Sequence, residues 1–262
     1  METQAGTGDQ SSREADKSAV GNFSIVVGGP VYDLLLRFHL VRQTLPNVWR
    51  RIIALMALIW LPLLVLSFSE GLAFGHEVRI PFLYDLAMYG RFLLGLPLLL
   101  FAEIGIDPAI RQAVSEFVNA RLVPDREFPQ FRSFLQRVQK VRDSWIPEII
   151  LLVLAFFPTF LFQHGWVTGG VTSWHTTASG LSAAGWWYAI VSAPVMRYIT
   201  YRWVFRYFLW PTVLWQISRL QLILIPTHPD RAAGVNFLAS TQGHFGIPAC
   251  ALGCSAAGAL AT

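Results

Sequence analysis

Residues Ile52–Phe68, IIALMALIWLPLLVLSF, contain no charged side chain, and Arg50 and Arg51 stand directly before them. About 20 consecutive apolar residues are needed for a helix to cross the ~30 Å hydrocarbon core of a bilayer. Extended to Ala73, this stretch predicts a first transmembrane helix over residues 52–73. Pro62 inside it predicts a kink.

The composition of the whole chain agrees with that interpretation. Of its 262 residues, 54% are hydrophobic and 14% are charged, whereas soluble domains are about 25% charged. This balance excludes a disordered protein and a fibrous repeat, and two cysteines exclude a disulfide scaffold. The composition therefore predicts an integral membrane protein.

Outward from the first span, four further apolar segments predict membrane helices. They cover about residues 81–106, 146–163, 181–201 and 236–262. Residues 52–262 are therefore expected to form an all-α, polytopic transmembrane helical bundle. Residues 207–226 are also apolar and could cross once more. We favour an interfacial amphipathic helix over residues 202–226, because its arginines gather on one side.

The remaining segments are predicted to lie outside the membrane. Residues 1–19 are polar and predict a disordered tail. Residues 20–51 predict a cytoplasmic amphipathic arm, either on the membrane surface or packed on its own bundle. Residues 107–145 carry two apolar stripes at helical spacing and predict a cytoplasmic helical hairpin that opens at Asp107-Pro108.

The positive charges alternate between successive segments. Lys and Arg number six in residues 1–51, two in 69–91, seven in 107–146, none in 164–180 and five in 197–231. The positive-inside rule then predicts a multi-pass protein of the cell inner (plasma) membrane with a cytoplasmic N-terminus. The lipid bilayer is the expected partner, and a homo-oligomer is left open. The arginines end apolar runs and form no separate basic domain, so no nucleic acid is expected.

Six polar residues are candidates for a pathway through the bundle. They are Arg91, Glu103, His228, Asp230, Arg231 and His244. A charge near membrane depth usually faces protein or a wet cavity. The alternative, which we favour for Arg91 and Glu103, places both at the interfaces with snorkelling side chains.

The densest polar stretch is PTHPDRAAG, residues 226–234. His228 and Asp230 could bind a metal or relay protons, but two ligands do not make a site. The favoured alternative is a corner between helices in which Asp230 caps the next helix. No metal and no cofactor is therefore expected.

Two more groups of side chains are singled out by their positions. Arg197, Arg202 and Arg206 lie in the aromatic run YITYRWVFRYFLW and could gather an anionic lipid headgroup. His164 and His175 lie in a loop without charged residues and are expected to be solvated.

The stretches RWVFRYFLW and ISRLQLILIPTHPDRAAGVNFL resemble a family of uncharacterised bacterial polytopic membrane proteins, whose signature has the form R-W-x-x-R…P-T-H-P-D-R-A-G-G. WLPLLVLS (60–67) and RFLLGLPLLLFAE (91–103) are similar too. Ala233 and Asn236 stand where the family has glycine. Members of the family are longer, so the resemblance implies an N-terminal fragment. It implies membrane placement and no activity.

Three functions are compatible with these features. The first is a transporter or channel component that uses the candidate pathway residues. The second is a membrane enzyme or binding protein for an anionic lipid headgroup. The third is a non-catalytic assembly or sensor subunit. No nucleotide-binding or hydrolase motif is present, so whether the chain is an enzyme stays undecided, with a non-enzyme favoured.

Overall fold

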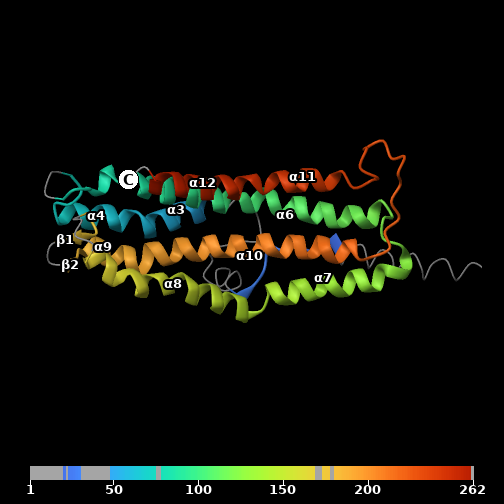
Figure 1. Cartoon of the computed structure of the whole chain (residues 1–262), viewed down its shortest axis with the longest axis horizontal. Coiled ribbons are helices and arrows are strands. Elements are labelled where there is room, and N and C mark those ends of the chain that lie inside the picture. The colour runs from blue at the N-terminus through green and yellow to red at the C-terminus, as the bar shows by residue number, and fades with distance from the viewer. Residues whose placement is uncertain are drawn as a thin grey trace, which may run out of the picture. The chain divides into compact units, whose positions relative to one another are not determined.

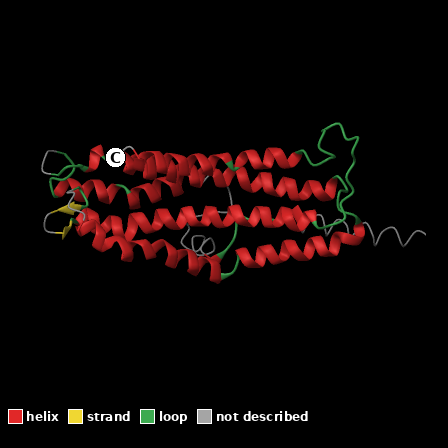
Figure 2. Ribbon diagram, in the orientation of Figure 1, coloured by secondary structure: helices red, strands yellow, loops and turns green. Residues whose placement is uncertain are grey.

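A computed structural model gives the fold of the chain. It describes residues 20–21, 23–30, 48–74, 78–168, 173–177 and 180–260. The predicted tail over residues 1–19 and most of the predicted arm lie outside this part. The described chain is mostly helical, as predicted, with one short pair of strands (Figure 2).

The elements follow one another along the chain as Figure 1 labels them. They are α3 (Val48–Ile59), α4 (Leu61–Ser69), η2 (Phe82–Tyr84), α5 (Leu86–Met88), η3 (Tyr89–Gly95), α6 (Leu96–Asn119), η4 (Asp125–Glu127), α7 (Phe128–Arg142), α8 (Trp145–Thr168), β1 (Thr176–Thr177), β2 (Gly180–Leu181), α9 (Ala183–Trp187), η5 (Tyr188–Ser192), α10 (Ala193–Ser218), α11 (Phe237–His244) and α12 (Gly246–Leu260).

In the described part of the chain, two helices are long and apolar enough to cross a membrane. Val48–Ser69 has 22 residues and corresponds to the predicted first span. Leu86–Asn119 has 34 residues and contains the predicted second span. A third candidate arises only if α7 and α8 are counted together as one bent span. The predicted spans over residues 181–201 and 236–262 stay predictions.

The first candidate span is interrupted where the sequence predicted a kink. The helix divides into α3 and α4 at Trp60, and Pro62 lies in the first turn of α4. Proline has no N–H to give to the preceding turn, which explains a break at this position.

Three predicted helix boundaries are wrong. α6 runs through Asp107 and Pro108 to Asn119, so no new helix opens there. α10 runs from Ala193 to Ser218 without a break near Tyr201, so residues 202–226 are not a separate helix. The apolar segment Asn236–Thr262 holds two helices, α11 and α12, that meet at Phe245. The sequence analysis took a proline and a run of arginines as helix ends. In α6 and α10 the helix continues through these residues.

The chain divides into two compact units. Unit 1 comprises the chain up to Pro30, Glu103–Ser144 and Arg206–Gly246. Unit 2 comprises Val31–Ala102, Trp145–Phe205 and Ile247–Thr262.

The core of unit 1 forms from the two predicted stripes of residues 107–145. Ile110, Val114 and Phe117 of α6 are buried, as are four residues of α7. The latter are Phe131, Phe134, Leu135 and Val138. Phe117 meets Phe237 of α11 edge to face, with ring centroids 5.1 Å apart. The two stripes are therefore confirmed as the apolar faces of α6 and α7. Val141, in the last turn of α7, continues the second stripe but is exposed.

The core of unit 2 is aromatic where the chain turns. Trp174 lies beside the short β1–β2 hairpin and is fully buried. Its ring packs edge to face on Phe82 at 5.1 Å and on Tyr188 at 5.6 Å. Phe92 meets the same Tyr188 at 6.3 Å. These four rings form one aromatic cluster within unit 2.

Small residues allow α12 to approach η3 and α5 closely. A side-chain carbon added at Gly90 would lie 2.7 Å from the Cys254 carbonyl oxygen, and one at Gly258 would lie 3.0 Å from the Leu86 oxygen. Only residues without a Cβ fit such contacts, which is how small residues bring membrane helices together.

Candidate functional site

The central feature of unit 2 is a hydrogen bond between Arg91 and Tyr188. Arg91 Nη1 donates to the Tyr188 hydroxyl oxygen at 2.7 Å. Arg91 lies on η3 and Tyr188 on η5, and both of these segments are π-helical. A π-helical turn inserts one residue into an α-helix, and such turns are frequent at functional sites. The hydrogen bond between the Arg91 guanidinium and the Tyr188 hydroxyl thus joins the two π-helical segments, η3 and η5.

Asp85 anchors the polar end of the aromatic core. Its Oδ2 accepts a hydrogen bond from Trp174 Nε1 at 2.8 Å, and its Oδ1 accepts one from the Ala87 N–H at 3.0 Å. The side chain is buried. Both carboxylate oxygens are therefore used to cap α5 and to hold Trp174 in place.

His175 is half-buried, which differs from the solvated side chain that we expected. Its ring stacks on Tyr188 with an interplanar angle of 14° and a centroid distance of 6.3 Å. Its Nδ1 lies 2.7 Å from Thr176 Oγ1 and 3.0 Å from Ser173 Oγ. Burial lowers the pKa of His175, and the negative charge of Asp85 only partly opposes that shift. The imidazole is therefore held in its neutral form next to Tyr188.

α10 places two of its arginines on partners within unit 2. Arg197 Nη1 donates to Thr159 Oγ1 at 2.8 Å and to the Ala155 carbonyl oxygen at 3.1 Å. Arg202 Nη2 lies 3.6 Å from Glu148 Oε1, and the other oxygen of Glu148 accepts a hydrogen bond from the Tyr198 hydroxyl. Arg202 thus has a carboxylate partner, whereas the acceptors of Arg197 are neutral.

In unit 1, the third arginine of this group meets a candidate pathway residue. Arg206 Nη1 donates to Glu103 Oε1 at 2.8 Å, and its Nη2 donates to the Val26 carbonyl oxygen at 2.8 Å. Only 6% of the Arg206 side chain and 17% of the Glu103 side chain are exposed. Within unit 1 the two charges of this ion pair are therefore largely withdrawn from solvent, and the interfacial placement of Glu103 stays a prediction.

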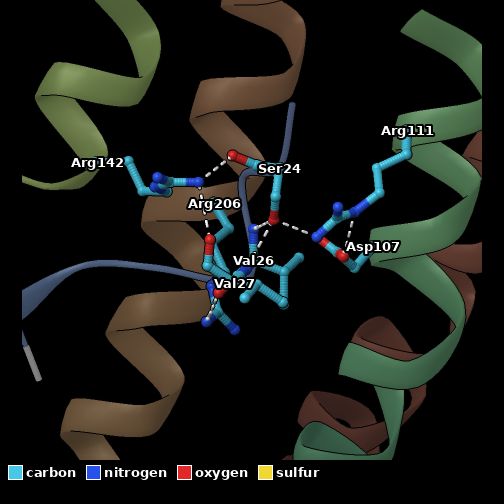
Figure 3. A network of polar contacts seen from close by, with 7 residues as sticks. All are labelled: Ser24, Val26, Val27, Asp107, Arg111, Arg142 and Arg206. Atoms are coloured by element: carbon cyan, nitrogen blue, oxygen red, sulfur yellow. Dashed lines mark hydrogen bonds and ion pairs between the residues drawn. The ribbon is translucent and has the colours of Figure 1, made fainter. Parts of the chain in front are cut away.

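The segment that includes Val26 is fastened by other polar groups (Figure 3). Figure 3 shows Ser24 between Arg142 and Asp107. The Ser24 hydroxyl donates to Asp107 Oδ1, and the Ser24 and Val27 carbonyl oxygens accept from Arg142 Nη1. The sequence analysis identified neither Ser24 nor Arg142 as part of such a network.

The predicted corner over residues 226–234 is built around Asp230. Its carboxylate accepts hydrogen bonds from the backbone N–H groups of Ala232, Gly234 and Asn236 at 2.9, 3.1 and 3.2 Å. His228 Nδ1 lies 2.9 Å from Asp230 Oδ1. Burial tends to raise the pKa of Asp230, but these donors outweigh it and hold the pKa well below its usual range. Asp230 therefore acts as the structural centre of a turn that leads into α11.

Two residues of this corner adopt left-handed backbone conformations. Arg231 has a φ of 58° and Ala233 has a φ of 57°. Side chains with a Cβ are strained in this region. Ala233 therefore occupies a position that suits glycine.

The other candidate residues lie apart from each other. Arg231 is exposed at the corner. His244 ends α11, where its Nδ1 lies 2.8 Å from the Ser240 carbonyl oxygen, and its ring covers Gly105. Among the described residues, no three His, Cys, Asp or Glu side chains are grouped to hold a metal ion.

The structure joins some candidates and separates others. Glu103 pairs with Arg206, and His228 pairs with Asp230. Tyr188, Asp85 and His175 were not identified from the sequence as functional residues. Asp85 and Tyr188 fall inside the predicted spans 81–106 and 181–201, and His175 lies in the loop without charged residues, so no shared pattern connects the three.

No family model, curated protein or solved structure matches this chain.

Proposed function

We propose that this chain is a multi-pass protein of the bacterial inner membrane, with a cytoplasmic N-terminus, and that it is a component of a transporter or channel. The observation that carries the proposal is the Arg91–Tyr188 pair at 2.7 Å. Arg91 belongs to a helix that is otherwise apolar enough to cross a membrane. An ionisable residue in such a helix is costly, so it commonly marks a pathway for a polar solute.

The length of that helix supports a part outside the membrane. Its 34 residues extend about 51 Å at 1.5 Å per residue, whereas the hydrocarbon core is about 30 Å thick. The excess belongs with the charged end of α6, which carries Asp107 and Arg111 joined by a 2.7 Å ion pair. We therefore place this end and α7 on the cytoplasmic side.

Two of the three arginines of α10 give little support to a headgroup site made by all three. Arg197 donates to neutral acceptors, Thr159 and Ala155. Arg202 and Arg206, by contrast, each have a carboxylate partner, which a lipid phosphate would have to displace. The transporter hypothesis does not require these ion pairs to be broken. If no flux is found, the hypothesis of a non-catalytic subunit is favoured.

The membrane topology can be tested by labelling with an impermeant thiol reagent. Cys250 and Cys254 are replaced by Ala, and one Cys is placed at Ala232. Labelling only after cell lysis is the expected result, because the corner is proposed to face the cytoplasm. Labelling of intact cells would contradict the proposed orientation, and recovery of the chain in the soluble fraction would contradict membrane insertion.

The transport function can be tested in proteoliposomes. Valinomycin carries potassium, so swelling in isotonic potassium chloride, acetate or phosphate reports entry of the anion. We expect protein-dependent swelling that is reduced by Arg91→Gln and by Tyr188→Phe. Tyr84→Phe is the matched control, because the Tyr84 side chain is exposed. Swelling equal to that of empty liposomes in every salt would contradict the proposal.

A further inference from the structure

Two positive side chains in unit 2 are linked by hydrogen bonds to the turn that holds Tyr188 and Ala189, and neither has a carboxylate partner among the described residues. Arg91 donates to the Tyr188 hydroxyl. Arg197 donates to Thr159 Oγ1, which in turn donates to the carbonyl oxygen of Ala189, next to Tyr188, at 3.3 Å.

Among the described residues, no carboxylate lies within ion-pair distance of either guanidinium. Asp85 is the carboxylate of the aromatic core, and its Oδ2 accepts a hydrogen bond from Trp174 while its Oδ1 accepts one from Ala87. Arg202 and Arg206, by contrast, have carboxylate partners 3.6 and 2.8 Å away. Unit 2 thus contains two arginines with neutral acceptors only.

Such an arrangement is costly unless a ligand supplies the missing charge. Both side chains are partly withdrawn from water, and charges in that setting are normally paired. An anion bound by both guanidinium groups would offset this cost.

We infer that Arg91, which donates to the Tyr188 hydroxyl, and Arg197, which is linked through Thr159 to Ala189, form a binding site for an oxyanion of the phosphate or carboxylate class. Guanidinium groups bind such anions through paired N–H donors. The inference rests on the proposed function in that it names the class of solute for the pathway, but binding and flux are separate measurements. The phosphate group can come from a free solute or from a lipid headgroup.

The free solute is tested with inorganic phosphate on the full chain in dodecylmaltoside. Trp174 packs on Tyr188, so tryptophan fluorescence is a suitable readout, with potassium chloride at equal ionic strength as the reference. We expect a saturable change that Arg91→Gln and Arg197→Gln each weaken about tenfold or more, since a charge-assisted hydrogen bond contributes about 1.5–3 kcal/mol.

Three further variants keep this test decisive. Arg79→Gln, at an exposed arginine of the same unit, should bind phosphate like the wild type. Arg91→Lys and Arg197→Lys keep the charge and should retain part of the affinity even if the Gln variants fail to fold, which size-exclusion chromatography reveals. Equal weakening by Arg79→Gln would overturn the site.

The lipid source is tested in nanodiscs of phosphatidylcholine alone and with phosphatidylglycerol. A fluorescence change that needs phosphatidylglycerol, Arg91 and Arg197, without a response to inorganic phosphate, identifies a headgroup as the anion. No response to either probe overturns the inference. Binding without liposome swelling contradicts transport and leaves the site intact, whereas Arg91-dependent swelling without binding contradicts the site alone.

Discussion

Arg206 and Glu103 form a largely buried ion pair within unit 1, with Nη1 and Oε1 2.8 Å apart. The sequence had given them different roles, Glu103 in a pathway and Arg206 at a lipid headgroup. Because each neutralises the other, and because Arg206 also holds the Val26 carbonyl oxygen, the pair has a structural role.

Breaking this pair should destabilise the protein strongly. Arg206→Met leaves the Glu103 carboxylate without its cation in a poorly solvated place, which typically costs about 3–5 kcal/mol. The double variant Arg206→Met/Glu103→Gln should cost less than the sum of the single variants. Thermal unfolding in detergent measures both effects.

Arg111→Gln is the control for that experiment. The Arg111 side chain is 34% exposed, so water can replace part of its ion pair with the buried Asp107, and the loss of stability should be smaller than in Arg206→Met. If Arg111→Gln lowers the melting temperature as much as Arg206→Met does, burial of the arginine does not decide how much an ion pair stabilises this protein.

Ala233→Gly should stabilise the corner around Asp230. The φ of 57° at Ala233 strains a residue with a Cβ by about 1–2 kcal/mol, and glycine relieves that strain while gaining some freedom in the unfolded chain. A rise in melting temperature is therefore expected. Ala232→Gly is the matched control, since Ala232 has no positive φ, and it should not raise the melting temperature.

Gly185→Ala should destabilise unit 2. A Cβ at Gly185 would overlap the carbonyl oxygen of His175, and overpacking of this kind costs about 1–3 kcal/mol. Gly253→Ala is the control, because no atom lies within 4 Å of a Cβ there. It should be neutral or slightly stabilising, as Ala is the better helix former. Equal melting temperatures for the two variants would refute the close contact.

The stability of the protein should fall on acidification through His175. Its folded pKa is lowered, so the unfolded chain takes up a proton first as the pH falls below the ordinary histidine value, about 6.5. The contribution of the neutral His175 to the free energy of unfolding is complete above pH about 6.5 and is lost as the pH falls toward the pKa of the folded state. His175→Phe keeps an aromatic ring on Tyr188 and should flatten this part of the pH dependence of the melting temperature. An unchanged slope would show that other groups cause it.

The sequence predicts the apolar faces of this chain well. The stripes of α6 and α7 are buried as expected, since helical spacing alone decides which residues of an amphipathic helix share a face. The break before Pro62 also follows from one residue type. These features depend on neighbours in the sequence.

Helix ends and polar partners depend on distant residues, which explains the failures. Pro108 and Arg202 both lie inside continuous helices. Arg202 marked a change in charge and not a helix end, since arginine is a good helix former. Arg91 and Tyr188 are separated by 97 positions, and Ser24 and Asp107 by 83. Nothing in the local pattern of either residue identifies the other.

The contacts of residues 23–30 also determine when this segment can fold during synthesis of the chain. Ser24 and Val26 leave the ribosome early, yet their partners Asp107, Arg142 and Arg206 are made much later. Chains emerge and fold from the N-terminus at about 5–20 residues per second, so the segment waits many seconds for its last partner. The first described segment to be synthesised is therefore among the last to be locked, and a nascent chain arrested before Arg206 keeps it accessible to a protease.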